Sequence, residues 1–576
     1  MDENISRRPR PSPNLDGLYA YTVPRAPAPT DLKLDSNEGV APPPGLLRAL
    51  AEAGPELMNR YVRAHELEAA LAAYHGVRPE QVLVTAGGDD AIDRCCRVFV
   101  QPDREVVLPV PTFEMAAVFA RLSGGRIVRV PWTKLAFPTA EALAAVTERT
   151  GMIVAISPNN PTGGVVAADD LRRISEAAPH AVLLVDLAYA DFAEVDLRST
   201  VFALPNAITV FTFSKAWGLA GLRVGYAIGP ADLIAPLRVS GGPYPVSNLS
   251  LTLATRWLRE GRAAVAATVD RVRQERAELQ ADLTRWGARP LPSQGNFVFA
   301  HCADPRWARD ALAGLGIAVR WIPPDGDFPA GLRITCPSDE ADFRRLQTAL
   351  HAVLAPEALL FDLDGVLADV SQSYRAVMQA VLDFYGVTIQ RDEIAAAKLE
   401  PDANDDWELT GRLLQRHGVE VSLDEVTQRF EALYQGTLES PGLWTRETLL
   451  PAPELLDQLA AKVPLAVVTG RPRADAWRFL ERHGLARRFQ AVICREDAPL
   501  KPDPAPVRLA LEKMSVRRAW LIGDASDDLR AARAAGVVPV GFLPAYARSD
   551  AAVAALHQAG AARVLTSLDE LKEILP

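Results

Sequence analysis

Apolar and polar positions alternate along most of the chain in a pattern that predicts helices separated by short, buried strands. From about Leu46 onward, stretches rich in Ala, Leu and Arg with helical spacing alternate with short runs rich in β-branched residues. Strands that are spaced by helices indicate a mostly parallel sheet with helices on both faces. The strands predicted in this first region are 82–85, 106–108, 152–156, 181–185, 207–211 and 224–228.

A smaller region of different pattern follows. A long helical stretch, 249–286, leads to three short apolar runs and a last helix at about 339–354. This pattern predicts a large domain at about 46–248 and a small α+β domain at about 249–354, with strands near 296–300, 318–321 and 331–335. Residues 1–45 contain nine prolines and are predicted to form an extended N-terminal arm.

A further α/β region, 357–576, begins almost directly after that helix. Its apolar runs 358–361, 465–468 and 519–522 each end in a polar group, namely Asp362, Thr469 and Gly523-Asp524. Ligands of open α/β sheets bind at the carboxyl ends of the strands, so these three endings predict one shared site. The mostly helical residues 370–459 between the first two runs have the size of a cap.

Composition narrows the class of protein. The chain has 576 residues, of which 49% are apolar and 23% charged, and its net charge of −10 argues against nucleic-acid or anionic-membrane partners. Small-molecule ligands are expected instead. Five scattered cysteines predict no disulfide framework, and no apolar run has signal-peptide or membrane-spanning length. A protein of the reducing cytoplasm is therefore expected.

Lys215 is the first candidate for chemistry, because it lies just after a predicted strand among hydroxyl groups and an arginine. A lysine amine attacks a carbonyl cofactor that is held beside it. Thr212, Ser214 and Arg223 offer the donors that a phosphate monoester needs, and the turn 87–90 adds backbone N–H groups at a helix N-terminus. The pattern predicts a cofactor with an aldehyde and a phosphate.

Other polar residues suit the ring of such a cofactor. Asp186 ends the strand 181–185, and a buried carboxylate keeps a pyridine nitrogen protonated. Tyr189, three residues further on, and Asn160 are candidates to hydrogen-bond a ring hydroxyl.

Taken together, these motifs resemble the fold-type I aminotransferases that use pyridoxal 5′-phosphate, in the histidinol-phosphate aminotransferase branch. The resemblance covers roughly residues 30–354 and implies the large and small domains of that fold. It rests on Ser157-Pro-Asn-Asn-Pro-Thr-Gly163, Asp186-Leu-Ala-Tyr189, Ser214-Lys215 with Arg223, and Pro243-Tyr-Pro245.

The resemblance implies a role for each matched residue. Lys215 would bond to the cofactor and move the reacting proton, and Asp186 would pair with the pyridine nitrogen. Asn160 and Tyr189 would hold the ring oxygen, and Phe113 would stack on the ring. The phosphate would be bound by Gly88, Asp89, Thr212, Ser214 and Arg223.

The resemblance also implies a homodimer and a substrate site. Tyr61 would reach the cofactor phosphate of the neighbouring subunit. Arg320 and Arg333, together with Asn37, would bind substrate, because a guanidinium suits both the carboxylate of glutamate and the phosphate of a phosphorylated amino alcohol. The chain departs from the family at Phe113, where tyrosine is usual, at Leu187, where an acid is usual, and at Gly39-Val40, where Asn-Pro is usual.

The second candidate site lies in the last region. Phosphoryl transfer through an aspartate needs a nucleophilic carboxylate, a second acid, a cation and Mg²⁺ held by oxygen ligands. Asp362 is the predicted nucleophile and Asp364, two residues on, the predicted general acid and base. Phosphate is expected at Thr469 and Lys501, and the predicted metal ligands are Asp362, Asp364, Asp524 and Asp528.

These residues resemble the phosphatase-like branch of the haloacid dehalogenase superfamily over residues 357–576. The superfamily has a Rossmann-like domain, here with a helical cap. Its four motifs arrive in order as Asp362-Leu-Asp-Gly365, Val468-Thr-Gly470, Lys501-Pro502 and Gly523-Asp-Ala-Ser-Asp-Asp528. Ala525 stands where a hydroxyl residue is common, and Asp527 adds an acid that could compete with Asp528 as a ligand.

Together the motifs predict a bifunctional enzyme. The leading hypothesis is glutamate-dependent transamination of imidazole acetol phosphate to L-histidinol phosphate, followed by Mg²⁺-dependent hydrolysis to histidinol, in histidine biosynthesis. One alternative is that the two domains act on another amino acid, or in a secondary-metabolite pathway. Another is that one domain is active and the other structural.

Overall fold

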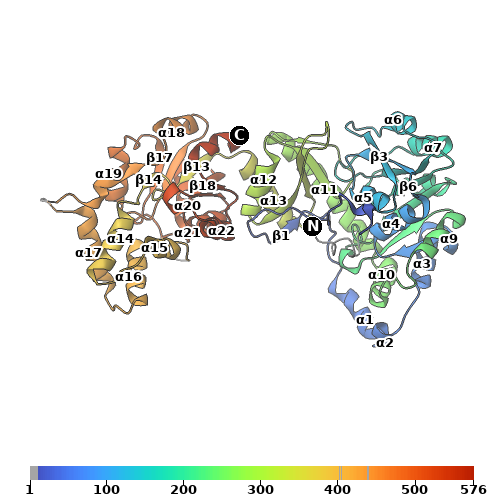
Figure 1. Ribbon diagram of the computed structural model, residues 1–576, viewed down its shortest axis with the longest axis horizontal. Helices are drawn as coiled ribbons and strands as arrows, with labels where there is room; N and C mark the ends of the chain where they lie inside the picture. Colours follow the sequence, from blue (N-terminus) through green and yellow to red (C-terminus); the bar gives the residue numbers. More distant parts are fainter. Residues whose placement is uncertain (1–10, 401–402, 404, 438–439) are drawn as a thin grey trace, which may run out of the picture. The chain divides into compact units, whose positions relative to one another are not determined.

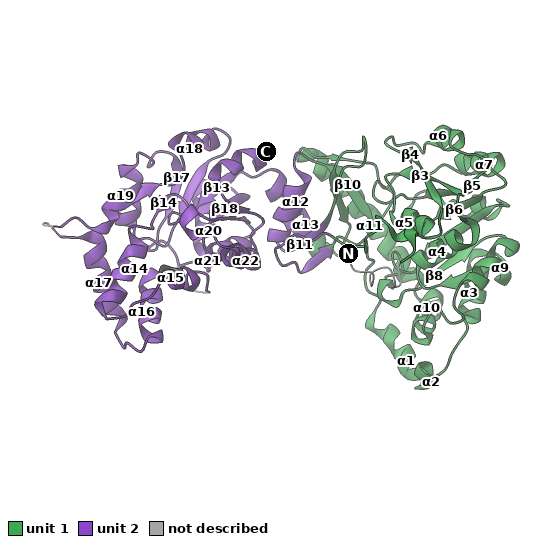
Figure 2. Ribbon diagram, in the orientation of Figure 1, with its two compact units in different colours: residues 1–23, 34–302, 320–343 green, residues 24–33, 303–319, 344–576 purple. Residues whose placement is uncertain are grey.

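The computed structural model describes residues 11–400, 403, 405–437 and 440–576 (Figure 1). Within these residues the chain forms two compact units (Figure 2). Unit 1 comprises residues 11–23, 34–302 and 320–343, and unit 2 comprises residues 24–33, 303–319 and the remainder from 344. Among the described residues, none of the helices combines the length and apolarity that crossing a bilayer requires.

A seven-stranded sheet forms the centre of unit 1, in the order β2-β8-β7-β6-β5-β3-β4. Most neighbours are parallel, whereas β8 runs antiparallel to β2 and β7. The inner strands β5 and β6 are buried along their whole length, as expected of strands covered on both faces. The strands are β2 (Val82–Thr85), β3 (Glu105–Val110), β4 (Arg126–Pro131), β5 (Thr150–Ile156), β6 (Val182–Asp186), β7 (Ala207–Thr212) and β8 (Gly225–Ile228).

Amphipathic helices surround this sheet. One of them, α4, packs on α5, α9 and the strands β7 and β8, and buries Ile92 and Cys95 against the sheet. The helices of unit 1 are α1 (Arg48–Ala53), α2 (Glu56–Asn59), α3 (His65–His75), α4 (Gly88–Phe99), α5 (Met115–Leu122), α6 (Thr139–Ala144), α7 (Ala168–Ala177), α8 (Arg198–Phe202), α9 (Ala231–Ser240), α10 (Asn248–Glu260) and α11 (Arg262–Arg285).

A second, five-stranded sheet has the order β1-β11-β12-β10-β9. Its strands β10, β11 and β12 are antiparallel neighbours. The helix α12 (Pro305–Gly314) begins where the Asp304 side chain accepts hydrogen bonds from the N–H groups of Arg306 and Trp307. The remaining elements are β1 (Leu32–Leu34), β9 (Arg289–Pro290), β10 (Phe297–His301), β11 (Ile317–Ile322), β12 (Gly331–Thr335) and α13 (Glu340–Leu354).

The last region of the chain is built on a six-stranded parallel sheet in the order β17-β16-β13-β18-β19-β20. The central strand β13 lies between β16 and β18, so the ends of these three strands are neighbours. The strands are β13 (Ala358–Phe361), β16 (Leu465–Val468), β17 (Phe489–Ile493), β18 (Ala519–Gly523), β19 (Val538–Phe542) and β20 (Val564–Leu565).

Helices of this region fall into a cap and a core set. The cap enters and leaves through the strand pair β14 (Ala368–Asp369) and β15 (Thr448–Leu449), and contains α14 (Tyr374–Phe384), α15 (Arg391–Ala397), α16 (Asp406–Arg416) and α17 (Leu423–Gln435). The core set is α18 (Pro453–Ala460), α19 (Arg473–Arg482), α20 (Ala505–Met514), α21 (Ser526–Ala534), α22 (Asp550–Ala559) and α23 (Leu571–Ile574).

The structure confirms the predicted α/β class and each predicted strand to within three residues at either end. The helical stretch 249–286 is two helices, α10 and α11, because the chain turns at Gly261. A Cβ at Gly261 would lie 2.5 Å from the Trp257 ring, so this close approach requires glycine. The longer strands β4, β17 and β19 were not predicted, nor were the strands of two or three residues, β1, β9, β14, β15 and β20.

Candidate active sites

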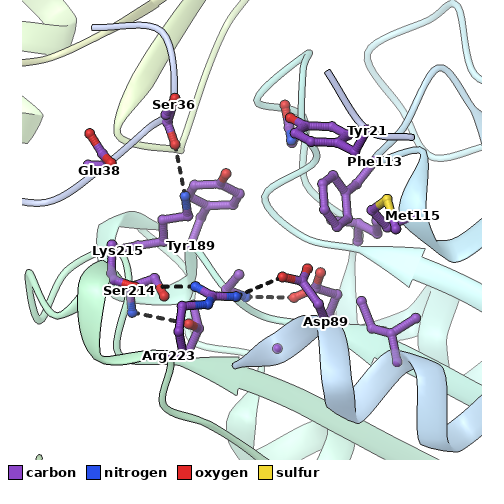
Figure 3. A pocket seen from close by; sticks show the side chains of 18 of the residues that line it. Tyr21, Ser36, Glu38, Asp89, Phe113, Met115, Tyr189, Ser214, Lys215 and Arg223 are labelled. Carbon is purple, nitrogen blue, oxygen red and sulfur yellow. Dashed lines mark hydrogen bonds and ion pairs between the residues drawn. The ribbon is translucent and has the colours of Figure 1, made fainter. Parts of the chain in front are cut away.

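Lys215 lies in a cavity of about 620 Å³ beside the carboxyl ends of β5, β6 and β7 (Figure 3). It follows β7 by three residues, and its Nζ donates a hydrogen bond to the carbonyl oxygen of Ser36 at 3.0 Å. Phe113 and Met115 lie across the cavity from Lys215 and Tyr189. Besides Lys215, ten predicted residues line the cavity: Gly88, Asp89, Phe113, Asn160, Asp186, Tyr189, Thr212, Ser214, Arg223 and Arg333.

One end of the cavity suits a phosphate group. Gly88 begins α4, whose N-terminal N–H groups favour an anion, and Arg223 lies beside it with Nη2 2.9 Å from Asp89 Oδ2. A Cβ at Gly87 would lie 2.7 Å from Arg223 Nη2, so glycine lets the guanidinium approach the turn. The hydroxyl-bearing residues Thr212 and Ser214 line the same cavity, so cation, N–H groups and hydroxyls lie around one space.

Asp186 supplies a buried carboxylate to the cavity. It ends β6 between Ile156 of β5 and Val210 of β7, and burial raises its pKa to about 6. Its Oδ1 accepts a hydrogen bond from the N–H of Ala188 at 2.9 Å. A protonated ring nitrogen would give this carboxylate the cationic partner that favours its ionised form, which fits the predicted pyridine.

Two of the residues predicted at the cofactor ring, Tyr189 and Asn160, are each held by hydrogen bonds. Asn37 Nδ2 donates to the Tyr189 hydroxyl oxygen at 3.0 Å, and Thr335 Oγ1 donates to Asn37 Oδ1 at 2.9 Å. Asn37 does not line the cavity itself but orients Tyr189, which does. Asn160 Oδ1 accepts from Arg333 Nη1 at 2.6 Å.

Arg333 is the cation best placed for an anionic substrate. It is buried, and Nη1 and Nη2 bond neutral oxygens, those of Asn160 and of the Asp35 carbonyl, at 2.6 Å each. Its Nε is buried and has no hydrogen-bond partner among the described residues. Burial lowers its pKa. Arg320 lies directly opposite it in the β11–β12 pair, with its guanidinium 5.8 Å from the Tyr21 ring centre, but does not line the cavity.

One predicted residue lies outside this cavity, and some groups at the cavity were not predicted from the sequence. Tyr61, predicted to act on a neighbouring subunit, is 83% exposed and stacks on Tyr244 at 4.5 Å, outside its own chain's cavity. The carbonyl of Ser36 was missed as the partner of Lys215, because a backbone acceptor carries no sequence signal. Met115 and Tyr21 also line the cavity.

The second site lies where β13, β16 and β18 end. Lys501 Nζ donates to Asp362 Oδ1 at 2.6 Å and to the Val468 carbonyl oxygen at 2.9 Å, and lies 2.5 Å from Asp528 Oδ1. Burial would lower the pKa of Lys501, but the carboxylates of Asp362 and Asp528 raise it instead, so the ammonium form is kept. Thr469, next to Val468, is buried at the same strand ends.

Three carboxylates at this site could hold a divalent cation. One oxygen each of Asp362, Asp524 and Asp528 lies within 4.8 Å of the others. Burial, then repulsion from Asp528, raises the pKa of Asp524 to about 7, and burial also raises the pKa of Asp362. A hard cation with oxygen ligands would offset this repulsion, so the residues fit the predicted Mg²⁺.

Asp364 is not part of this carboxylate group. Its Oδ1 instead accepts hydrogen bonds from Arg471, from Nε at 2.7 Å and from Nη2. The role of Asp364 as a fourth metal ligand stays a prediction. A cavity of about 270 Å³ under the cap reaches Asp362 and Asp364, and its wall includes Tyr374, Lys398 and Asp406, none of which belongs to a sequence motif.

Comparison with known families defines both halves of the chain. Residues 30–350 match the family described as aminotransferase class I and II, and residues 359–542 match the family described as haloacid dehalogenase-like hydrolase. The chain belongs to the class I and II aminotransferases and carries a haloacid dehalogenase-like domain after the aminotransferase region. Class I and II aminotransferases use pyridoxal phosphate, which agrees with the fit of the first cavity.

Individual relatives match parts of the chain. An aromatic amino acid aminotransferase of Mycobacteroides abscessus is 37% identical over 294 residues, which is 50% of this chain and 84% of that protein. An imidazoleglycerol-phosphate dehydratase of Phytophthora nicotianae is 44% identical over 240 residues, which is 38% of this chain and only 52% of that protein.

Solved structures support the fold. The histidinol-phosphate aminotransferase of Sinorhizobium meliloti, in complex with pyridoxal-5′-phosphate, matches 61% of this chain and 99% of its own at 24% identity, with a TM-score of 0.55. A putative histidinol-phosphate aminotransferase of Erwinia carotovora matches 58% of this chain and 98% of its own at 26% identity, with a TM-score of 0.51. The first region is thus a fold-type I aminotransferase.

Proposed function

We propose that the chain is a bifunctional enzyme that makes a phosphorylated amino alcohol and then removes its phosphate. In this proposal glutamate transaminates imidazole acetol phosphate to L-histidinol phosphate, and the second domain hydrolyses that phosphomonoester to histidinol. The observation that carries the proposal is Arg333, a buried guanidinium bonded to neutral oxygens only in the described structure. Such a group can receive either the carboxylate of glutamate or a substrate phosphate.

The transamination uses residues that the structure already places around the first cavity. When bound, pyridoxal phosphate supplies an aldehyde that bonds the amino nitrogen and a ring that withdraws electrons from the substrate Cα. Lys215 Nζ would remove the proton from the substrate Cα, and Asp186 would keep the ring nitrogen protonated. Tyr189 and Asn160 would orient the ring oxygen, and Arg333 would fix the substrate anion.

The phosphate hydrolysis in the second domain is an in-line displacement at phosphorus. Asp362 would attack the phosphorus while Asp364 gives its proton to the leaving alcohol oxygen. Water would then attack the phosphoryl group, lose a proton to Asp364 and release phosphate with free Asp362. Lys501 and Thr469 would bind the phosphate, and Mg²⁺ held by Asp362, Asp524 and Asp528 would offset its charge.

The proposal also covers the oligomeric state of the enzyme and its cellular compartment. A homodimer through the aminotransferase region is proposed because Tyr61, 83% exposed on its own chain, is free to reach a partner. A cytoplasmic enzyme is proposed because five scattered cysteines in a chain of 576 residues suit a reducing compartment.

The names of relatives support two different substrates. Histidinol-phosphate aminotransferases among the solved structures, and a relative named for imidazoleglycerol phosphate, favour an imidazole phosphate. The 37% identity to an aromatic amino acid aminotransferase favours an aromatic amino acid for the first domain. The second candidate leaves the phosphatase acting on an unrelated ester.

One assay on the purified full chain tests the proposal. With Mg²⁺, glutamate and imidazole acetol phosphate, we expect 2-oxoglutarate and inorganic phosphate to form. Lys215→Ala should abolish 2-oxoglutarate formation but still release phosphate from added L-histidinol phosphate. Asp362→Asn should still form 2-oxoglutarate but release no phosphate. Turnover of an aromatic 2-oxo acid, with no reaction of either imidazole phosphate, would select the second candidate.

A further inference from the structure

Arg471 is a buried arginine beside the phosphatase site. It belongs to none of the sequence motifs by which that site was identified. It follows Thr469-Gly470 at the end of β16, and its side chain is 1% exposed. Burial would lower its pKa, but Asp364 and its other neighbours raise it, so the guanidinium is charged. A charge removed from water this completely has to be matched by specific partners.

The partners of Arg471 lie on both sides of the active site. Toward the core, Nε donates to Asp364 Oδ1 at 2.7 Å and Nη2 donates to the same oxygen. Toward the cap, Nη1 donates to Glu447 Oε2 at 2.9 Å and to the Tyr434 hydroxyl oxygen at 3.3 Å. The guanidinium also lies 4.9 Å from the centre of the Tyr374 ring.

Glu447, the second acid in this cluster, is itself fixed. Its Oε1 accepts hydrogen bonds from Ser373 Oγ at 2.9 Å and from the Tyr434 hydroxyl at 3.1 Å. Glu447 directly precedes β15, which pairs with β14 just after the Asp364 loop. The backbone N–H of Arg471 donates to Thr469 Oγ1 at 3.2 Å, which leaves the hydroxyl hydrogen of Thr469 free to face a phosphate.

We propose that Arg471 is the positioning residue for the general acid and base Asp364. By holding Oδ1 with two N–H groups, it leaves Oδ2 as the oxygen that carries the proton to the leaving alcohol and takes one from the attacking water. Glu447 and Tyr434 hold Arg471 in turn and tie its position to the cap. The inference rests on the phosphatase half of the proposed function and adds a residue to it.

The test compares two phosphate esters that differ in their need for a proton. An alkyl ester such as L-histidinol phosphate expels a poor leaving group that must be protonated, whereas p-nitrophenolate leaves without a proton. For Arg471→Gln in the full chain with Mg²⁺, we expect kcat/KM for the alkyl ester to fall by about 10²–10⁴-fold, the usual contribution of general acid catalysis. For p-nitrophenyl phosphate the fall should stay below about tenfold, because the first step does not need the acid.

The second step gives an independent readout. Hydrolysis of the phosphorylated Asp362 still needs Asp364 as a base, so Arg471→Gln should release a stoichiometric burst of p-nitrophenolate followed by slow turnover. If Arg471 acts through Asp364, the double variant Asp364→Asn/Arg471→Gln should be no slower than Asp364→Asn alone. Arg473→Gln is the matched control, because Arg473 is half-exposed and pairs with Asp497 away from Asp364.

Arg471→Lys answers the same question if the glutamine variant does not fold. Lysine keeps a charge opposite Glu447 but cannot offer Asp364 two N–H groups from a rigid fork, so the selective loss on the alkyl ester should persist. Equal losses on both esters, additive effects in the double variant, or wild-type alkyl turnover by Arg471→Lys would overturn the inference. A wild-type chain that hydrolyses neither ester would instead overturn the proposed phosphatase function.

Discussion

Individual side chains in both sites carry charges that the protein has taken out of water, and Asp186 is the clearest case. Its pKa is raised to about 6 from an ordinary value of 3.8, chiefly by burial. Since the ionised form is the disfavoured one, the carboxylate costs no stability below pH 4, an increasing amount between pH 4 and 6, and its full amount above pH 6. Without cofactor, this cost is unrelieved.

Asp186→Asn is therefore expected to stabilise the cofactor-free protein while it removes transaminase activity. At pH 8 the variant should gain about 2–3 kcal/mol in the unfolding free energy of the aminotransferase region. Denaturation of cofactor-free protein at pH 8 and pH 5 measures this, and the gain should be smaller at pH 5. Transaminase kcat should fall by at least about 100-fold because a neutral amide cannot keep the ring nitrogen protonated. A less stable variant at pH 8 would show that Asp186 already has a cationic partner.

The residues that could be predicted from sequence are those that carry their chemistry within a short motif. Lys215, Asp186 and Asp362 lie at or just after strand ends, Arg223 and Lys501 lie in short motifs of their own, and the structure places each in one of the two sites. Arg471 was missed because its partner Asp364 is 107 residues away, and Ser36 because it binds Lys215 through its backbone from 179 residues away. Long-range pairs of this kind follow from topology, which one sequence does not reveal.

At the scale of elements, the segment 35–40 shows why the chain departs from its family at Gly39. This segment crosses the turn that carries Lys215, and a Cβ at Gly39 would lie 1.9 Å from the Lys215 carbonyl oxygen. A Cβ at Gly218, in the same turn, would lie equally close to the Val40 carbonyl oxygen. Two backbones therefore touch where the family's usual asparagine would not fit without a shift.

Gly39→Ala is expected to displace the Lys215 turn and weaken cofactor binding by about tenfold or more, because a clash with backbone costs about 1–3 kcal/mol. Absorbance titration with pyridoxal phosphate measures this affinity. Gly45→Ala is the matched control in the same stretch, since its Cβ would meet nothing closer than the Arg48 side chain at 3.5 Å. Phosphatase activity should not change in either variant. Wild-type cofactor affinity in Gly39→Ala would contradict the contact.

Elements with strong periodicity were the predictable ones. Strands buried on both faces, such as β5 and β6, read as unbroken apolar runs. The edge strand β4 was missed because its exposed arginines interrupt the apolar pattern, and β19 because Pro539 and Gly541 within it are typical of turns. Tertiary pairing overrides both local signals.

At the scale of the whole molecule, the boundaries of the two compact units differ from the boundaries of the two families. Unit 2 takes residues 24–33 and 303–319 from the aminotransferase region and packs them with residues 344–576. Arg533 of α21, the helix that carries Asp528, donates to the Pro29 carbonyl oxygen at 2.9 Å and lies 3.3 Å from Asp31. The haloacid dehalogenase-like domain is thus completed by segments that belong to the other family.

Two tryptophans form the apolar centre of this contact. Trp307 of α12 and Trp520 of β18 are 3% and 0% exposed, and their ring centres lie 4.8 Å apart. Trp520 Nε1 also donates to the Ala352 carbonyl oxygen of α13 at 3.0 Å. Since β18 ends next to Asp524, the packing of Trp520 supports a strand of the phosphatase site.

A residue of the aminotransferase region should therefore stabilise the phosphatase. Trp307→Ala in the full chain is expected to cost about 3–5 kcal/mol and to lower the temperature of phosphatase inactivation by roughly 10 °C. Residual hydrolysis of p-nitrophenyl phosphate after heating measures it. Trp132→Ala is the control, because Trp132 is equally buried but packs on Phe137 within unit 1, so it should lower the stability of the transaminase alone. If Trp307→Ala leaves phosphatase inactivation unchanged while it weakens the transaminase, then the phosphatase domain is stable without α12, and the boundary between the families is also the boundary between the cooperative units.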